Sequence, residues 1–152
     1  MDEKTIKFNP YLIEKEGKHV RALTIVLPGI RAISRNQTSG HYFKYREQLK
    51  RAERWMLTYG KAVEYHFEKQ VDVTIEAYYN TKGRRKLTDT PNIDDKIFTD
   101  ILNRFKPRKK GPAAERAVWF IEDDAPKFLR KVTKRSVPCT YDEVRIFIEA
   151  VS

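Results

Sequence analysis

The order of apolar and polar residues along this chain predicts an α+β fold with one sheet and two helices. Strands are predicted where residues alternate or where β-branched residues gather, at 19–27, 71–79, 128–137 and 141–151. Two other segments repeat apolar residues at three- and four-residue spacing, which predicts helices over 42–59 and 93–105. The predicted order is β-α-β-α-β-β, and the simplest arrangement of it packs both helices on a mostly antiparallel or mixed sheet.

The length of 152 residues predicts a single domain, because domains usually have about 100–200 residues. We expect residues 19–152 to form this domain and the weakly patterned residues 1–18 to form an N-terminal arm or an edge strand. Residues 30–40 contain few core-type side chains and are expected to form a loop. The segment Pro138-Cys139-Thr140 is expected to be the turn between the last two strands.

The first predicted helix is amphipathic. Its apolar stripe comprises Tyr45, Leu49, Ala52, Met56 and Tyr59. Its outer face is strongly basic, with Lys44, Arg46, Lys50, Arg51 and Arg54. Trp55, like Trp119, lies in an otherwise packed stretch, which favours a place in the core over a role in base stacking.

Composition limits the function classes. The chain has 31 Lys and Arg against 21 Asp and Glu, a net charge of +10, which indicates a polyanionic partner such as nucleic acid. It has no apolar run of about 18 residues, so we expect no membrane span. No apolar region follows the acidic opening residues, so no secretory signal is expected. The single cysteine excludes an internal disulfide and a cysteine-based zinc site and favours the cytoplasm.

Two acidic clusters stand out in this basic chain. The first spans 89–96 and contains Asp89, Asp94 and Asp95, at the start of the second predicted helix. The second, Glu122-Asp123-Asp124, follows an apolar run. Helix capping explains the first cluster without any chemistry, with Asn92 as a suitable N-cap, and an ordinary turn explains the second.

Taken together, the clusters indicate a metal site. Mg²⁺ prefers carboxylate oxygens, and in phosphodiester cleavage it polarises the phosphate and stabilises the leaving oxygen. A domain that only binds nucleic acid gains nothing from carboxylates beside the phosphate backbone, because like charges repel. A basic surface with a small acidic pocket is the charge arrangement that a nuclease needs.

These motifs resemble the RusA-type Holliday-junction resolvases, in particular their phage and prophage members. Residues 33–36 and 41–46 are similar to the family's Asn-containing loop and basic helix. Residues 89–102 resemble its Asp-x-Asp-Asn-x-x-Lys motif with a trailing Asp-x-Leu, and residues 121–127 resemble its acidic turn followed by a basic strand. The C-terminal strand, residues 144–148, matches in pattern, and the resemblance covers about residues 20–150.

The central motif aligns with the family pattern in two ways. One alignment matches Asp89, Asn92, Lys96 and Asp100 but places Pro91 where the second catalytic Asp belongs. The other matches Asn92 and Asp94 to the two Asp positions and places Phe98 at the lysine position. Both alternatives remain open at this point.

The resemblance implies a homodimer that cuts branched DNA, in the cytoplasm of a bacterial or phage-infected cell, with Mg²⁺ as cofactor and Mn²⁺ as a substitute. It implies catalytic roles for Asp94, Asp124, Asp89 and Lys96, and metal ligation by Asp94, Asp124, Asp89, Asp123 and Asp95. The basic segments supply candidate DNA contacts: Lys44, Arg46, Lys50, Arg84, Arg85, Lys86, Lys109, Lys110, Lys127 and Arg130. The alternative is a basic nucleic-acid-binding module without catalysis, in which the carboxylates serve only as caps and turns.

Overall fold

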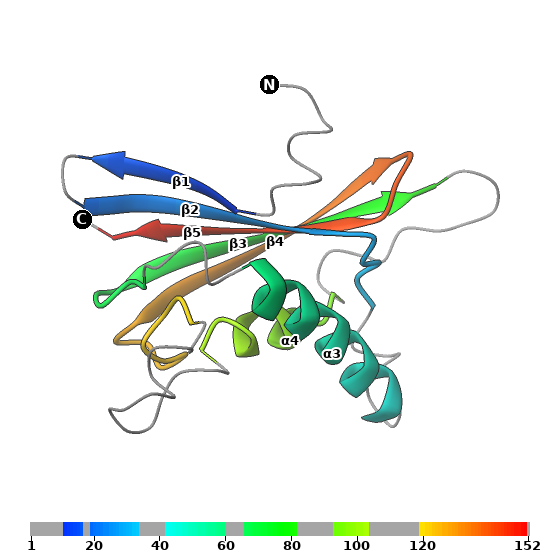
Figure 1. The fold of residues 1–152 in the computed structure, drawn as a ribbon, viewed down its shortest axis with the longest axis horizontal. Helices are drawn as coiled ribbons and strands as arrows, with labels where there is room; N and C mark the ends of the chain where they lie inside the picture. The colour runs from blue at the N-terminus through cyan, green and yellow to red at the C-terminus, as the bar shows by residue number, and fades with distance from the viewer. Residues whose placement is uncertain are drawn as a thin grey trace.

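The computed structural model describes residues 11–16, 19–33, 42–59, 66–81, 93–103 and 119–151. The elements are β1 (Tyr11–Glu16), β2 (His19–Pro28), α3 (Tyr42–Tyr59), β3 (Val71–Asn80), α4 (Asp95–Asp100), β4 (Leu129–Cys139) and β5 (Glu143–Ala150). Within these residues the strands form one five-stranded sheet in the order β1-β2-β5-β3-β4 (Figure 1). The predicted α+β fold and its β-α-β-α-β-β order are confirmed, and β1 adds a strand at the sheet edge beside β2.

The sheet is mixed. β1 with β2, β2 with β5, and β3 with β5 pair in antiparallel fashion, whereas β3 and β4 are parallel. Parallel neighbours need a long crossover connection. The chain between β3 and β4 contains α4 and the acidic turn, so the candidate site residues belong to this crossover.

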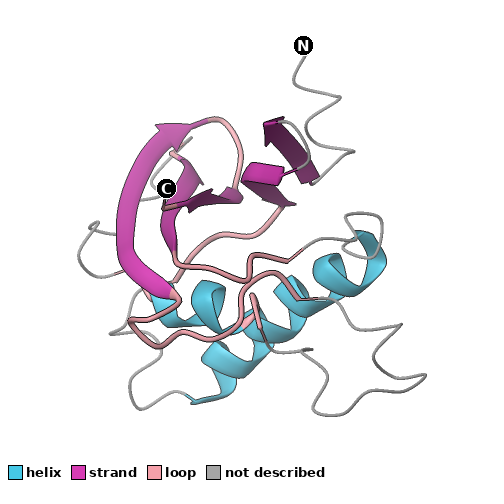
Figure 2. Cartoon of the chain, turned by 90° about the vertical axis from the view of Figure 1, so that its left-hand side faces the viewer, coloured by secondary structure: helices cyan, strands magenta, loops and turns pink. Residues whose placement is uncertain are grey.

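Both helices cover the same face of the sheet, as the two views in Figures 1 and 2 agree. β3 alternates buried and half-buried residues along its whole length, and its buried side chains face the helices. α4 and the turn after it are anchored by four side chains with no exposed surface: Ile97 and Phe98 in the helix, and Ile101 and Leu102 in the turn. α3 contributes the buried Leu49, Ala52 and Met56 from its predicted apolar stripe.

The opposite face of the sheet is polar and half-buried. Arg145 donates from Nε to Glu143 Oε2 at 2.7 Å, and its guanidinium lies 4.3 Å from the centre of the Tyr78 ring. Burial, followed by a hydrogen bond to Glu76, raises the pKa of Tyr78 to about 12. These polar side chains form hydrogen bonds and ring contacts with one another on that face of the sheet. The candidate site lies on another part of the molecule.

The predicted bounds of the second helix and of the turn between the last two strands are wrong. The second helix begins at Asp95 instead of 93, because Asp94 has a non-helical ψ of 88°, and it gives way to a turn after Asp100. β4 continues through Pro138 to Cys139, so the predicted turn at 138–140 lies later, at 140–142. Pro138 is tolerated there because β4 is an edge strand of the described sheet. On the open side of an edge strand no neighbouring strand needs a backbone N–H as hydrogen-bond donor.

Candidate functional site

The N-terminal end of α4 is fastened to the segment that follows β2. The backbone N–H of Asp94 donates to the carbonyl of Ile33 at 3.0 Å. Asp94 is only 5% exposed and occupies the N-cap position, yet its side chain makes no capping hydrogen bond. Capping therefore does not account for this carboxylate, while Asn92, the cap expected from sequence, lies outside the described residues.

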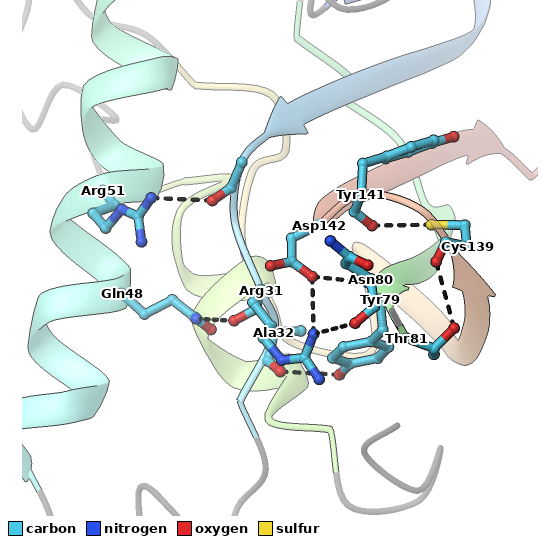
Figure 3. A network of polar contacts seen from close by, with 11 residues as sticks. Arg31, Ala32, Gln48, Arg51, Tyr79, Asn80, Thr81, Cys139, Tyr141 and Asp142 are labelled. Carbon is cyan, nitrogen blue, oxygen red and sulfur yellow. Dashed lines mark hydrogen bonds and ion pairs between the residues drawn. The ribbon is translucent and has the colours of Figure 1, made fainter. Parts of the chain in front are cut away.

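A network of polar contacts holds residues 29–33 in place (Figure 3). Arg31 donates to Asp142 Oδ1 at 2.9 Å and to the carbonyl of Asn80 at 3.2 Å, which ties the segment to the ends of β3 and β5. The hydroxyl of Tyr79 donates to the carbonyl of Ala32 at 3.0 Å. The segment to which Asp94 is hydrogen-bonded is thereby held by β3 and by the turn before β5.

α3 contributes a polar residue from its buried face. Gln48 is buried, and its Nε2 donates to the carbonyl of Arg31 at 2.6 Å while its Oε1 accepts from the N–H of Ile33 at 3.4 Å. A buried amide is stable only when its polar atoms are paired, and these backbone groups pair it. Gln48 thus fixes the same segment from the helix side.

Asp95 begins α4 and pairs with a lysine of β4. Lys134 Nζ lies 3.5 Å from Asp95 Oδ1, and the two side chains are 19% and 18% exposed. The pair joins the N-terminal end of α4 to the edge strand of the sheet. This ion pair gives Asp95 a structural partner that the sequence did not indicate.

The C-terminal end of α4 is fastened to the segment that leads into the acidic turn. The carbonyl of Leu102 accepts from the N–H of Phe120 at 2.7 Å and from that of Ile121 at 3.4 Å. The last carbonyls of a helix have no partner within it, so an adjoining backbone can satisfy them. This attachment brings Glu122, Asp123 and Asp124 to the end of α4.

Two other carboxylates act on Asp124 there. The pKa of Asp124 is raised, first by its hydrogen bond with the Asp123 side chain, then by burial, and then by the negative charges of Asp123 and Asp100. The backbone N–H of Asp124 also donates to Asp123 Oδ1 at 2.8 Å. Asp100 is oriented by the hydroxyl of Tyr45 on α3, which donates to Oδ2 at 2.7 Å. We call Asp100, Asp123 and Asp124 the acidic corner.

An aromatic stack lies in the segments next to the acidic corner. The rings of His66 and Trp119 are stacked, with centroids 3.6 Å apart and an interplanar angle of 24°. His66 Nε2 lies 3.7 Å from Glu122 Oε1 and 3.8 Å from Glu68 Oε1. Trp119, expected in the core, is half-buried against this histidine.

The structure brings together only some of the residues expected from sequence. Asp123 and Asp124 lie in the acidic corner, whereas Asp94 and Asp95 lie at the other end of α4. Lys96 is exposed on α4, four residues before Asp100, and Asp89 lies outside the described residues. Sequence reasoning did not assign Asp100 or Tyr45 to the site, although Asp100 stood in the motif alignment. Asp100 lies four residues after Lys96, and Tyr45 belongs to the apolar stripe of the first predicted helix. Neither position indicated in the sequence that these two side chains contact each other.

The acidic corner supplies the oxygen donors that a hard divalent cation requires. The hydrogen bond with Asp123, burial and the charges of Asp123 and Asp100 raise the pKa of Asp124, and a bound cation would favour the ionised carboxylate again, so the donor chemistry fits Mg²⁺ or Mn²⁺. Within the part of the chain that the structure describes, however, no three His, Cys, Asp or Glu side chains are arranged so that they could hold a metal ion. The described residues by themselves therefore do not form a complete metal site.

The expected DNA contacts lie in different settings. Arg46 and Lys50 are exposed on α3, and Lys127 is exposed directly after the acidic turn, with Nζ 5.4 Å from the centre of the Phe128 ring. Arg130 makes two hydrogen bonds to Asp72 of β3, and this contact lowers the pKa of Asp72. The structure does not describe the side chain of Lys44 or any of Arg84, Arg85, Lys86, Lys109 and Lys110.

Comparison with known proteins adds no relative. No protein-family model matches the chain, and no curated protein matches it. No helix in the described ranges has the length and apolar character needed to cross a membrane.

Proposed function

We propose that this protein is a divalent-metal-dependent endonuclease that cuts branched DNA, with the four-way junction as its substrate. The observation that carries the proposal is the acidic corner, where Asp124 is hydrogen-bonded with Asp123 and is within reach of the charge of Asp100, in a chain of net charge +10. Like charges placed together are costly, and a fold that keeps them so indicates a cationic ligand.

In this proposal Asp123 and Asp124 hold the cation, and the hydrogen bond from Tyr45 holds the Asp100 carboxylate in one orientation. Mg²⁺ or Mn²⁺, when bound, polarises the phosphodiester and assists formation of the hydroxide nucleophile. Lys96 lies one helical turn before Asp100, on the same side of α4, which suits it to contact the scissile phosphate. Asp94 and Asp89 are the candidates for completing the ligand set.

The basic side chains supply affinity for the DNA backbone. Arg46 and Lys50 on α3 and Lys127 after the acidic turn are exposed and available to phosphates. Such contacts release counterions, so binding weakens steeply as salt rises. Paired nicks across a junction need two active sites related by a two-fold axis, which is why the proposal includes a homodimer.

A second candidate is a nucleic-acid-binding module without catalysis. It is favoured by the ion pair between Asp95 and Lys134, which gives one of the expected ligands a structural role. The absence of a three-ligand group among the described residues points the same way.

Cleavage of a labelled synthetic four-way junction separates the two candidates. The junction and a linear duplex of the same sequence are incubated with Mg²⁺, Mn²⁺ or EDTA. We compare the wild type with D124N and with the control E149Q, which removes the same charge from an exposed position on β5. The endonuclease proposal expects metal-dependent, symmetric nicks on the junction that D124N abolishes and E149Q preserves. Junction binding without nicks in any metal supports the binding module, and no binding at moderate salt contradicts both.

A further inference from the structure

The exposed side of α3 carries a depression of about 300 Å³. Its described lining is Arg51, Arg54, Trp55 and Thr58. These positions follow the i, i+3, i+4, i+7 spacing that puts residues on one side of a helix. We call this depression the Trp55 pocket.

The Trp55 pocket combines a fixed aromatic ring with two cations. Trp55 is half-buried and packs against the hydrophobic core, so its indole is held by α3 and the core beneath it. Arg51 is exposed, and its Nη2 donates to the carbonyl of Gly29 at 3.0 Å, a contact drawn in Figure 3. Gly29 has a φ of +74°, a left-handed conformation that glycine adopts readily, and this turn presents its carbonyl to Arg51.

Arg54 and Thr58 form the exposed rim of the Trp55 pocket. A guanidinium binds phosphate oxygens through two parallel N–H groups, and a threonine hydroxyl donates to the same kind of oxygen. An indole face stacks on any nucleobase, with little dependence on sequence. An aromatic ring flanked by two arginines is therefore complementary to a nucleotide whose base is unstacked.

The size of the Trp55 pocket favours one unpaired nucleotide over duplex DNA. About 300 Å³ is at the small end of the range for pockets that hold a single small ligand. In a duplex the base faces are covered by neighbouring bases, so the indole can stack only on a base that has left the duplex.

We propose that the Trp55 pocket binds an unpaired nucleotide of single-stranded or branched DNA, with the base on Trp55 and the phosphate between Arg51 and Arg54. This inference rests on the part of the proposed function that makes DNA the partner, and it does not depend on cleavage. Unpaired nucleotides occur where duplex arms meet, and a pocket on α3 distinguishes such DNA from a linear duplex.

The test measures binding in EDTA, so that no cleavage occurs. The probes are oligothymidine of about 12 nucleotides, within the usual site size of single-strand-binding folds, and a blunt duplex of the same length. The W119F variant leaves Trp55 as the only tryptophan and keeps an aromatic ring beside His66. Oligothymidine should quench the fluorescence of Trp55 in this variant, and the duplex should not.

Matched arginine variants test the pocket without disturbing the core. R54Q removes a charge inside the Trp55 pocket, and R46Q removes the same charge from an exposed position on α3 outside the described lining. R54Q should weaken oligothymidine binding about 5- to 10-fold, and R46Q less than about 3-fold, because a pocket contact is lost in addition to general attraction. The two variants should bind the duplex equally. W55L should weaken oligothymidine binding at least about 5-fold, provided that its circular dichroism matches the wild type.

The inference is overturned if R54Q and R46Q lose equal affinity for oligothymidine, or if Trp55 fluorescence does not respond. Failure of the proposed function is separate. If oligothymidine quenches Trp55 in a protein that cuts no junction, the proposal for the Trp55 pocket is supported and the nuclease proposal is contradicted. If cleavage depends on Asp124 but Trp55 is not quenched, only the proposal for the Trp55 pocket is contradicted.

Discussion

The two ends of α4 carry the same type of side chain in opposite electrostatic settings. At the N-terminal end, Asp95 lies 3.5 Å from the ammonium of Lys134. At the C-terminal end, a hydrogen bond with Asp123, burial, and the negative charges of Asp123 and Asp100 raise the pKa of Asp124. The carboxylate at the N-terminal end is paired with a cation from the sheet, whereas Asp124 at the other end has other carboxylates as neighbours.

This difference shows that the role of a carboxylate depends on what the rest of the fold brings to it. α4 has six residues, so its two ends lie only about 9 Å apart along the helix axis. β4 approaches one end, and the acidic turn is attached to the other through the carbonyl of Leu102. We therefore assign a structural role to the pair of Asp95 and Lys134, and we place the acidic corner in the proposed site.

The largest expected effect on stability comes from removing a buried side chain that anchors α4 as a whole. Phe98 has no exposed surface and lies between the two ends of α4, so F98A should lower the free energy of unfolding by about 3–5 kcal/mol. Urea denaturation measures the loss. L57A is the matched control, because Leu57 on α3 is 51% exposed and should cost no more than about 0.5 kcal/mol. A loss below 1 kcal/mol for F98A, on the order of an ordinary surface change, would contradict the anchoring role.

Removal of the cation should destabilise the N-terminal end of α4. K134M leaves the largely buried Asp95 carboxylate without this lysine, and the expected loss is about 1–2 kcal/mol, between the values for exposed and buried pairs. The double variant K134M/D95N should recover part of that loss, which a double-mutant cycle measures. Additive losses would show that the pair contributes nothing to the difference between the two ends.

Mg²⁺ should stabilise the acidic corner. At a metal concentration tenfold above the dissociation constant, a single site adds about 1.4 kcal/mol, a rise in Tm of about 3–5 °C. Thermal melts of wild type, D124N and E149Q with Mg²⁺ or EDTA measure this effect. The shift should disappear in D124N and persist in E149Q, and a shift that persists in D124N would place the metal elsewhere.

The smallest effect concerns the pH dependence of stability. The raised pKa of Asp124 means that its contribution to stability is present below the unfolded pKa and is lost as pH rises through the folded pKa. Without metal, D124N should therefore melt about 1 °C above wild type at pH 7, given a repulsion of a few tenths of a kcal/mol, with no gain at pH 3.

D72N provides the opposite case for this experiment. Arg130 lowers the pKa of Asp72, so this carboxylate stabilises the fold above its unfolded pKa, and the contribution is lost as pH falls through the folded pKa. D72N should consequently melt below wild type at pH 7 and approach it at low pH. Shifts of the same sign in D124N and D72N would contradict the assignment of repulsion to the acidic corner.

Sequence reasoning recovered most of the secondary structure because that information is local. The bounds of α3 were predicted as observed, and the alternation predicted for 71–79 is the burial pattern of β3. The sequence did not indicate that β3 and β4 are parallel, since alternation is the same in either direction. Gln48 also escaped prediction, because only the carbonyl of Arg31 and the N–H of Ile33 make its burial favourable.

For the candidate site, sequence reasoning supplied residue types and the structure supplied their partners. The sequence alone determined a basic α+β domain with two acidic clusters between two of its predicted strands. The tertiary structure decided that Asp124 is within reach of the charge of Asp100, that Asp95 pairs with Lys134 39 residues away, and that Tyr45 reaches Asp100 across 55 residues. The physical reason is the distance in sequence over which each property is set. Periodicity and capping depend on neighbours in sequence, whereas the charge around a carboxylate depends on whichever segments the packed core brings beside it.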